Sequence, residues 1–303
     1  MQTEIIKIKS NFDGLDLEVM LALPSMSPVG VIQISHGMCE FKERYLSFMQ
    51  FFTDKGYIVV CPDQRGHGNS VKKEEDRGYF YETKAEGIIK DCAQITTEIK
   101  NKYPNLPITL FGHSMGSMIV RCYLQHYDTL IDKLIVCGSP SKNPLAFLGI
   151  TLTKIITLFK GERHRSKVLS YLSTGHGDKN FPGEDKGAWL SRNKENVKAY
   201  RSDKRGNYRF TCNGFENLFR LMQKTYNQKL YKVQNPNLPI HFVSGSDDAV
   251  MVSEKKFKDA VNSLREVGYQ QVTYKLYEGM RHEVHNELEA ESVLYDLLAF
   301  IEN

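Results

Sequence analysis

The chain has 303 residues, of which 41% are hydrophobic and 25% are charged, and its formal net charge is +4. These proportions are typical of a soluble globular protein, and a chain of this length can bury a sizeable core. No apolar run is long enough to cross a bilayer, and the N-terminus lacks a basic stretch followed by an apolar block, so we expect a cytoplasmic protein without a signal peptide.

Strands and helices are predicted to alternate along most of the chain. Apolar and β-branched runs predict strands over residues 4–9, 15–23, 29–35, 57–61, 108–111, 133–137, 240–244 and 271–277. Helical periodicity predicts helices over residues 44–55, 83–103, 115–127, 254–267 and 287–301. This alternation favours a mostly parallel sheet covered on both faces, with the first two strands pairing antiparallel at its edge.

Residues 139–236 interrupt the alternation. About a hundred residues between two strands are too many for a loop, so we expect an inserted helical cap, with residues 1–138 and 237–303 forming the main domain. The insertion holds 19 lysines and arginines but 7 aspartates and glutamates, whereas the rest of the chain holds 21 and 29. This uneven distribution of charge is informative about the partners that the protein can bind, but not about its fold.

The segment Gly112-His-Ser-Met-Gly116 is a G-x-S-x-G motif between a predicted strand and a predicted helix. In this context the turn exposes a nucleophilic serine, here Ser114, above a parallel sheet. By itself the motif occurs by chance in roughly one chain in ten of this length. The alternative is an ordinary glycine-rich turn whose serine has no chemical role.

A nucleophilic serine needs a base, and the base needs an acid that orients it. His282 follows the last predicted strand and would lie at the carboxyl end of the sheet, where Ser114 also lies. Asp247 and Asp248 follow the preceding strand, which gives the chain order serine, aspartate, histidine expected for this turn. Asn286 is predicted to cap the closing helix. A solvated loop histidine and two turn-forming aspartates are the alternatives.

An oxyanion hole needs two backbone N–H groups where negative charge develops. One would belong to Met115, which follows the serine. The second would come from Met38, because Gly37 lets the loop after an early strand approach a ligand. In the same loop, Cys39 is interpreted as a bystander and His36 as a structural residue that bonds the loop backbone.

No metal, organic cofactor or nucleic acid is predicted as a partner. The six cysteines form no C-x-x-C pair and lie mostly in apolar patterns, so we expect reduced core thiols. Residues 281–285 do not match H-E-x-x-H, which excludes that zinc motif. Residues 63–70 lack both phosphate-loop signatures and are interpreted as a structured turn.

Five segments occur in the order and at the spacing of one known family: Ser35-His-Gly-Met38, Asp63-Gln-Arg-Gly-His-Gly68, Gly112-His-Ser-Met-Gly116, Gly245-Ser-Asp-Asp248 and Tyr277-Glu-Gly-Met-Arg-His282. On these motifs the chain resembles the α/β-hydrolase fold, and within it the monoacylglycerol lipase and bacterial lysophospholipase group. The resemblance covers the chain outside the predicted cap. It implies an eight-stranded, mostly parallel sheet, a Ser114–Asp248–His282 triad and oxyanion donors at Met38 and Met115. The family's acid is the fourth residue of the G-x-x-D turn, which selects Asp248.

The resemblance implies a serine hydrolase that cleaves lipid-like monoacyl esters through an acyl-enzyme. A general carboxylesterase, an aminopeptidase and a non-catalytic binding protein stay open as alternatives. An aminopeptidase would need acidic cap residues to hold a substrate ammonium group, whereas a binding protein would not need an intact triad.

An apolar stripe in the predicted cap bears on the substrate. Leu148, Leu152 and Ile155 recur at helical spacing, and a basic segment follows them. Such a helix can line an acyl groove or lie on a membrane surface. We therefore expect these three residues to contact the acyl chain of the substrate and the basic cap to contact anionic lipid. Plain packing of this helix on the main domain is the alternative.

Overall fold

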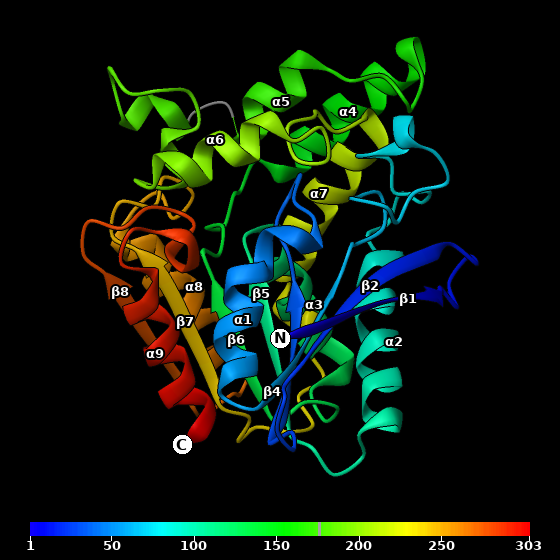
Figure 1. Cartoon of the computed structure of the whole chain (residues 1–303). Helices are drawn as coiled ribbons and strands as arrows, with labels where there is room; N and C mark the ends of the chain where they lie inside the picture. The colour runs from blue at the N-terminus through cyan, green and yellow to red at the C-terminus, as the bar shows by residue number, and fades with distance from the viewer. Residues whose placement is uncertain (175–176) are drawn as a thin grey trace.

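The computed structural model describes residues 1–174 and 177–303, and an eight-stranded sheet runs through it (Figure 1). The strands are β1 (Gln2–Lys9), β2 (Asp16–Leu23), β3 (Gly30–Ser35), β4 (Tyr57–Pro62), β5 (Ile108–His113), β6 (Lys133–Cys137), β7 (Ile240–Gly245) and β8 (Val272–Tyr277). Their order in the sheet is β1-β2-β4-β3-β5-β6-β7-β8. All neighbours from β4 to β8 are parallel, whereas β2 pairs antiparallel with β1 and with β4. The predicted sheet, including its antiparallel edge, is confirmed.

Helices cover both faces of this sheet. They are α1 (Leu46–Asp54), α2 (Gly87–Lys102), α3 (Met115–Tyr127), α8 (Glu254–Glu266) and α9 (Ala290–Glu302). One core contains Phe48 of α1 and Leu297 of α9, and the other contains Ile95 of α2, Tyr123 of α3 and Phe257 of α8. Every residue of β3, β4 and β5 is buried, as expected for parallel strands packed on two sides.

Three helices begin later than their periodicity predicted. The first opens as a 3-10 turn over Lys42–Tyr45, and α2 begins at Gly87, because the Glu82 carboxylate accepts hydrogen bonds from the N–H groups that precede the helix. The closing helix begins at Ala290. The predicted capping role of Asn286 is wrong, since this residue lies in a separate 3-10 turn and its amide donates to Glu283.

The segment between β6 and β7 holds four further α-helices among its described residues: α4 (Ala146–Lys160), α5 (Lys167–Thr174), α6 (Lys194–Ser202) and α7 (Cys212–Thr225). In Figure 1, α4, α5 and α6 lie beyond one end of the sheet, and α7 runs from this layer toward α3. Phe215 and Leu221 of α7 belong to the same core as α3. The segment therefore lies over one end of the sheet and also contributes to the main core. Every helix in residues 1–174 and 177–303 is too short or too polar to cross a membrane.

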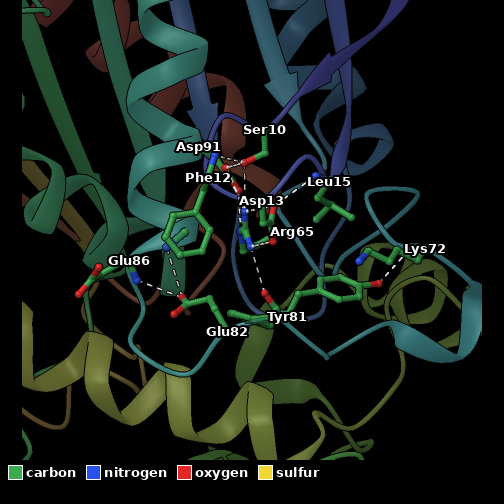
Figure 2. Close-up of polar contacts among 12 residues, drawn as sticks. Ser10, Phe12, Asp13, Leu15, Arg65, Lys72, Tyr81, Glu82, Glu86 and Asp91 are labelled. Carbon is green, nitrogen blue, oxygen red and sulfur yellow. Dashed lines mark hydrogen bonds and ion pairs between the residues drawn. The ribbon is translucent and has the colours of Figure 1, made fainter.

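Ion pairs of the buried Arg65 and Asp63 side chains hold the segment of residues 63–70 in place, and Figure 2 shows those of Arg65. The Arg65 guanidinium donates to Asp91 at 2.6 Å and to Asp13 at 2.9 Å, which ties the β1–β2 turn to α2. Asp63 accepts hydrogen bonds from the backbone and the ammonium group of Lys42, both at 2.8 Å. These charged groups pair with one another. Residues 63–70 therefore form a structured turn, as predicted.

Candidate active site

Ser114 occupies a strained turn between β5 and α3. Its φ of 54° and ψ of −116° are unfavourable for a residue with a side chain, and they form the sharp turn that presents a nucleophile. The turn is possible because residue 116 is a glycine. A Cβ atom at this position would lie only 1.9 Å from the carbonyl oxygen of Ser35. Helix α3 can thus approach β3 closely, and the Ser114 N–H donates to Cys137 O at 2.9 Å.

His282 and Asp248 form a buried pair at the carboxyl ends of β8 and β7. The Nδ1 atom of His282 lies 3.0 Å from both carboxylate oxygens of Asp248. Ser244 Oγ also donates to Asp248 at 2.8 Å, so the carboxylate is held from two sides. The adjacent Asp247 is exposed. Of the two candidate aspartates, the structure therefore places Asp248 against the histidine.

The pKa values of the pair are displaced in opposite directions. Burial lowers the pKa of His282, but the Asp248 carboxylate raises it more, so the pKa lies above its ordinary value. Burial raises the pKa of Asp248, but the charge of His282 and the hydrogen bonds to the carboxylate lower it below the ordinary value. The pair can therefore hold a proton on the imidazole beside an ionised carboxylate.

Ser114 and His282 line one cavity of about 530 Å³. Nδ1 of His282 is engaged by Asp248, while the buried Nε2 has no hydrogen-bond partner among the residues that the structure describes. An imidazole with one nitrogen fixed by a carboxylate and the other free can accept a proton from a serine hydroxyl. The structure thus brings together the three residues that the sequence singled out.

Met38 and Met115, the predicted oxyanion donors, lie at the same cavity as this serine. Both residues line the cavity, and neither amide donates to a backbone or side-chain acceptor within residues 1–174 and 177–303. Gly37 precedes Met38, and a Cβ atom there would lie 2.7 Å from Glu40 and 3.1 Å from the Ser114 Cβ. Two unoccupied amides next to the nucleophile can bind a developing oxyanion.

The surroundings of His36 agree with its predicted structural role, and those of Cys39 agree with its predicted role as a bystander. Gln64 N donates to Nε2 of His36 at 3.0 Å, and Nδ1 of His36 lies 2.8 Å from Gly37 O, so the ring joins two loops. Burial lowers the pKa of His36 and keeps the ring neutral. Burial raises the pKa of the Cys39 thiol, whose Sγ donates to Tyr208 O.

The sequence did not reveal a buried network beside the loop of residues 36–40, which carries Met38. Glu40 accepts hydrogen bonds from the Gly37 N–H at 2.6 Å and from the Tyr45 hydroxyl at 2.9 Å. Arg44 bridges Glu40 and Glu283, the residue after the histidine. Burial raises the pKa of Glu283, but Arg44 outweighs this and lowers it to about 2, so the carboxylate is ionised. The network couples the loop that carries Met38 to the loop that carries His282.

A contact between the segment that joins β6 to β7 and the loop of His282 was also not predictable from the sequence. The Trp189 ring lies 5.1 Å from the His282 ring, between ring centroids. Arg281 donates to both carboxylate oxygens of Glu184, at 2.6 and 2.9 Å, and stacks on Phe181 at 3.9 Å. The segment between β6 and β7 therefore forms part of the wall around the candidate base.

The proposed substrate residues of α4 lie elsewhere. Leu148 and Ile155 are 49% and 51% exposed, and Leu152 packs against the core. None of the three lines the cavity with Ser114. Leu148 and Ile155 point outward because α4 packs on α7 with a neighbouring face, whose buried residues are Ala146, Ile150 and Thr153. Apolar side chains from α3 and α7 line the cavity instead: Met115, Met118, Leu218 and Met222.

All six cysteines are free and buried. One group of described residues has ligand atoms close enough to hold a metal ion: those of His113, Cys137 and His285 lie within 4.8 Å of one another. Burial raises the pKa of the Cys137 thiol and lowers that of His285 to about 3. A metal would require the Cys137 thiolate, which burial disfavours, and none of the candidate triad residues belongs to the group.

Comparison with known proteins places this site in a family. Residues 26–289 match the family described as Serine aminopeptidase, S33. A monoacylglycerol lipase from Mycolicibacterium smegmatis is 28% identical over 280 residues, which cover 92% of this chain and 90% of the relative. A monoglyceride lipase from Rattus norvegicus is 27% identical over 301 residues, which cover 96% and 88%.

The fold is shared with solved structures. A carboxyl esterase from Bacillus coagulans superposes with a TM-score of 0.89 at 24% identity, over 100% of this chain and 98% of that chain. This likeness shows the α/β-hydrolase fold. The family match spans Met38, Ser114, Asp248 and His282. The chain therefore belongs to the Serine aminopeptidase, S33 family and is an enzyme, a hydrolase of the monoacylglycerol lipase type.

Proposed function

We propose that the protein is a serine-dependent carboxylic ester hydrolase that cleaves lipid-like monoacyl esters, such as monoacylglycerols or lysophospholipids. The observation that carries this proposal is the cavity shared by Ser114 and His282, with Asp248 bound to the far nitrogen of the imidazole. The names of the relatives from M. smegmatis and R. norvegicus support a monoacyl glycerol ester as substrate.

The proposed reaction is a two-step acyl transfer. His282 takes the proton of the Ser114 hydroxyl as its oxygen attacks the ester carbonyl carbon, and the amides of Met38 and Met115 hold the resulting oxyanion. The protonated His282, beside ionised Asp248, then gives its proton to the leaving alcohol. A water molecule attacks the acyl-enzyme with His282 again as base, which releases the fatty acid and restores the serine.

The charges around the cavity favour an ester over an aminopeptidase substrate. An aminopeptidase needs a free carboxylate to bind the substrate ammonium group. Among the described residues that line the cavity, the carboxylates are Glu40 and Glu283, and both are ion-paired with Arg44. The apolar methionine and leucine side chains of α3 and α7 instead suit an acyl chain.

A substrate panel tests this proposal. We expect kcat/KM for p-nitrophenyl esters to rise with acyl length until the chain fills the apolar cavity, and we expect hydrolysis of monoacylglycerols or lysophospholipids. An aminoacyl amide should not be cleaved. Cleavage of the amide alone, or equal rates for acetyl and long-chain esters, would contradict the proposal.

We further propose that residues 139–236 form the cap of this site and that α4 docks on lipid surfaces. Leu158 and Phe159 are 80% and 76% exposed, and they belong to an apolar surface on α4 that Lys154 and Lys160 flank. An exposed apolar helix with basic neighbours can enter the lipid interface, with added attraction to anionic headgroups.

Vesicle binding tests the docking surface. We expect the protein to bind vesicles containing anionic lipid more tightly than neutral vesicles, with the difference shrinking as salt is added. The double variant Leu158→Ser/Phe159→Ser should weaken binding to both kinds of vesicle, because it removes apolar contact and leaves the charge unchanged. Binding that is independent of anionic lipid and of salt would exclude the electrostatic contribution.

A further inference from the structure

Two lysines line the candidate active-site cavity, one from a loop and one from the first turn of a helix. Lys142 lies in the loop after β6, and Lys256 lies in the first turn of α8, after β7. Since β6 and β7 are parallel neighbours, the segments that follow them leave the sheet at the same end, the carboxyl end of both strands. Ser141 Oγ donates to Met251 O at 2.5 Å, which joins the two loops. Both lysines thus belong to one side of the cavity mouth.

Neither of these ammonium groups has a charged partner among the residues that the structure describes. Within residues 1–174 and 177–303, Lys142 and Lys256 form no ion pair or side-chain hydrogen bond. Other lysines of α8 do form them, because Lys255 pairs with Asp259 at 3.2 Å and Lys258 with Glu254 at 2.6 Å. Both lysines at the mouth are exposed and leave positive charge where substrate enters.

The carboxylates of the cavity do not offset this charge at the mouth. Glu40 and Glu283 are buried and bound to Arg44 beside the loop that carries Met38. A cleft with charge of one sign on its rim and apolar walls inside raises the local concentration of oppositely charged ligands. The apolar walls suit an acyl chain, so the charge that meets the lysines belongs to the polar part of the substrate.

We propose that Lys142 and Lys256 select monoacyl esters whose alcohol part carries an anionic group, of which glycerol phosphate is the simplest. This inference rests on the proposed esterase function and narrows its substrate class. The two ammonium groups bind the anion as point charges, a common mode of phosphate binding by lysine. The ester carbonyl then lies over Ser114 while the acyl chain occupies the cavity between α3 and α7.

The test compares substrates that share one short acyl chain and stay below their micellar concentration. The substrates are 1-acylglycerol (neutral), 1-acylglycerol-3-phosphate (anionic) and 1-acylglycero-3-phosphocholine (zwitterionic). For the wild type we expect the highest kcat/KM with the anionic ester and a decline with added salt for that ester alone. In the double variant Lys142→Gln/Lys256→Gln, the anionic-to-neutral ratio of kcat/KM should fall roughly three- to tenfold.

The matched control is Lys100→Gln/Lys102→Gln, which also removes two positive charges, here from exposed positions on α2 that do not line the cavity, and should keep the wild-type ratio. An unchanged ratio in the mouth variant, or an equal fall in the control, would overturn the proposal. A preference that appears only with micelles or vesicles would overturn it too, because the lysines would then serve the lipid surface. Loss of hydrolysis for all three esters in the wild type would instead refute the proposed function itself.

Discussion

Ser114→Ala should lower kcat/KM for a long-chain p-nitrophenyl ester by about a million-fold, the scale seen when a triad nucleophile is removed. The reason is that the acyl-enzyme cannot form without the hydroxyl, while the amides of Met38 and Met115 retain only weak oxyanion stabilisation. The same variant should lose covalent labelling by a fluorophosphonate, which can be read on a gel or by mass spectrometry.

Ser173 provides the matched control for this change. It lines the same cavity, and its hydroxyl donates to the backbone of Ser170, away from any role in the proposed chemistry. Ser173→Ala should therefore keep labelling and most of the turnover. Labelling that survives in Ser114→Ala would show that another nucleophile carries the activity.

Asp248→Asn should lower kcat by about ten thousandfold with little change in the fold. An amide in place of the carboxylate no longer stabilises the imidazolium that forms during the reaction, and it favours the wrong tautomer of His282. Asp247→Asn is the matched control, because Asp247 is the exposed neighbour that makes no contact with the imidazole. Equal losses in the two variants would contradict the assignment of the acid.

The pH profile gives this prediction a second readout. The base must be neutral to act, and Asp248 raises the pKa of His282 above its ordinary value near 6.5, so wild-type kcat/KM should fall as the pH drops through a midpoint above 6.5. In Asp248→Asn, the strongest influence that raises the pKa of His282 is lost while burial still lowers it, so the acid limb should move to lower pH. An acid limb that stays in place would show that another group controls it.

The Ser114 turn, the order of the candidate triad residues and most of the strands were predictable because their signals are local. A strand, a glycine-bracketed serine and a helix follow one another within ten residues, and each triad candidate follows a recognisable strand. The parallel sheet then brings the carboxyl ends of strands that are distant in sequence to one end of the sheet. Only the capping role given to Asn286 failed among these local features, because the Val284–Asn286 turn occupies the place of the expected helix start.

Features that depend on distant contacts were not predictable. Arg44 and Glu283 are 239 residues apart in sequence, and nothing in either local pattern announces their ion pair. The apolar stripe of α4 looked like a substrate groove, but the face that a helix buries is decided by its partner, here α7. The position of Trp189 against His282 likewise depends on how the segment between β6 and β7 folds back on the sheet.

Trp189 is the only tryptophan of the chain, and its indole lies beside the imidazole of the candidate base. A protonated imidazole quenches the emission of a nearby indole, whereas a neutral one quenches it weakly. The intrinsic fluorescence of the unlabelled protein should therefore titrate with the protonation of His282. This gives the enzyme a built-in optical probe of its own active site, usable in the absence of any substrate.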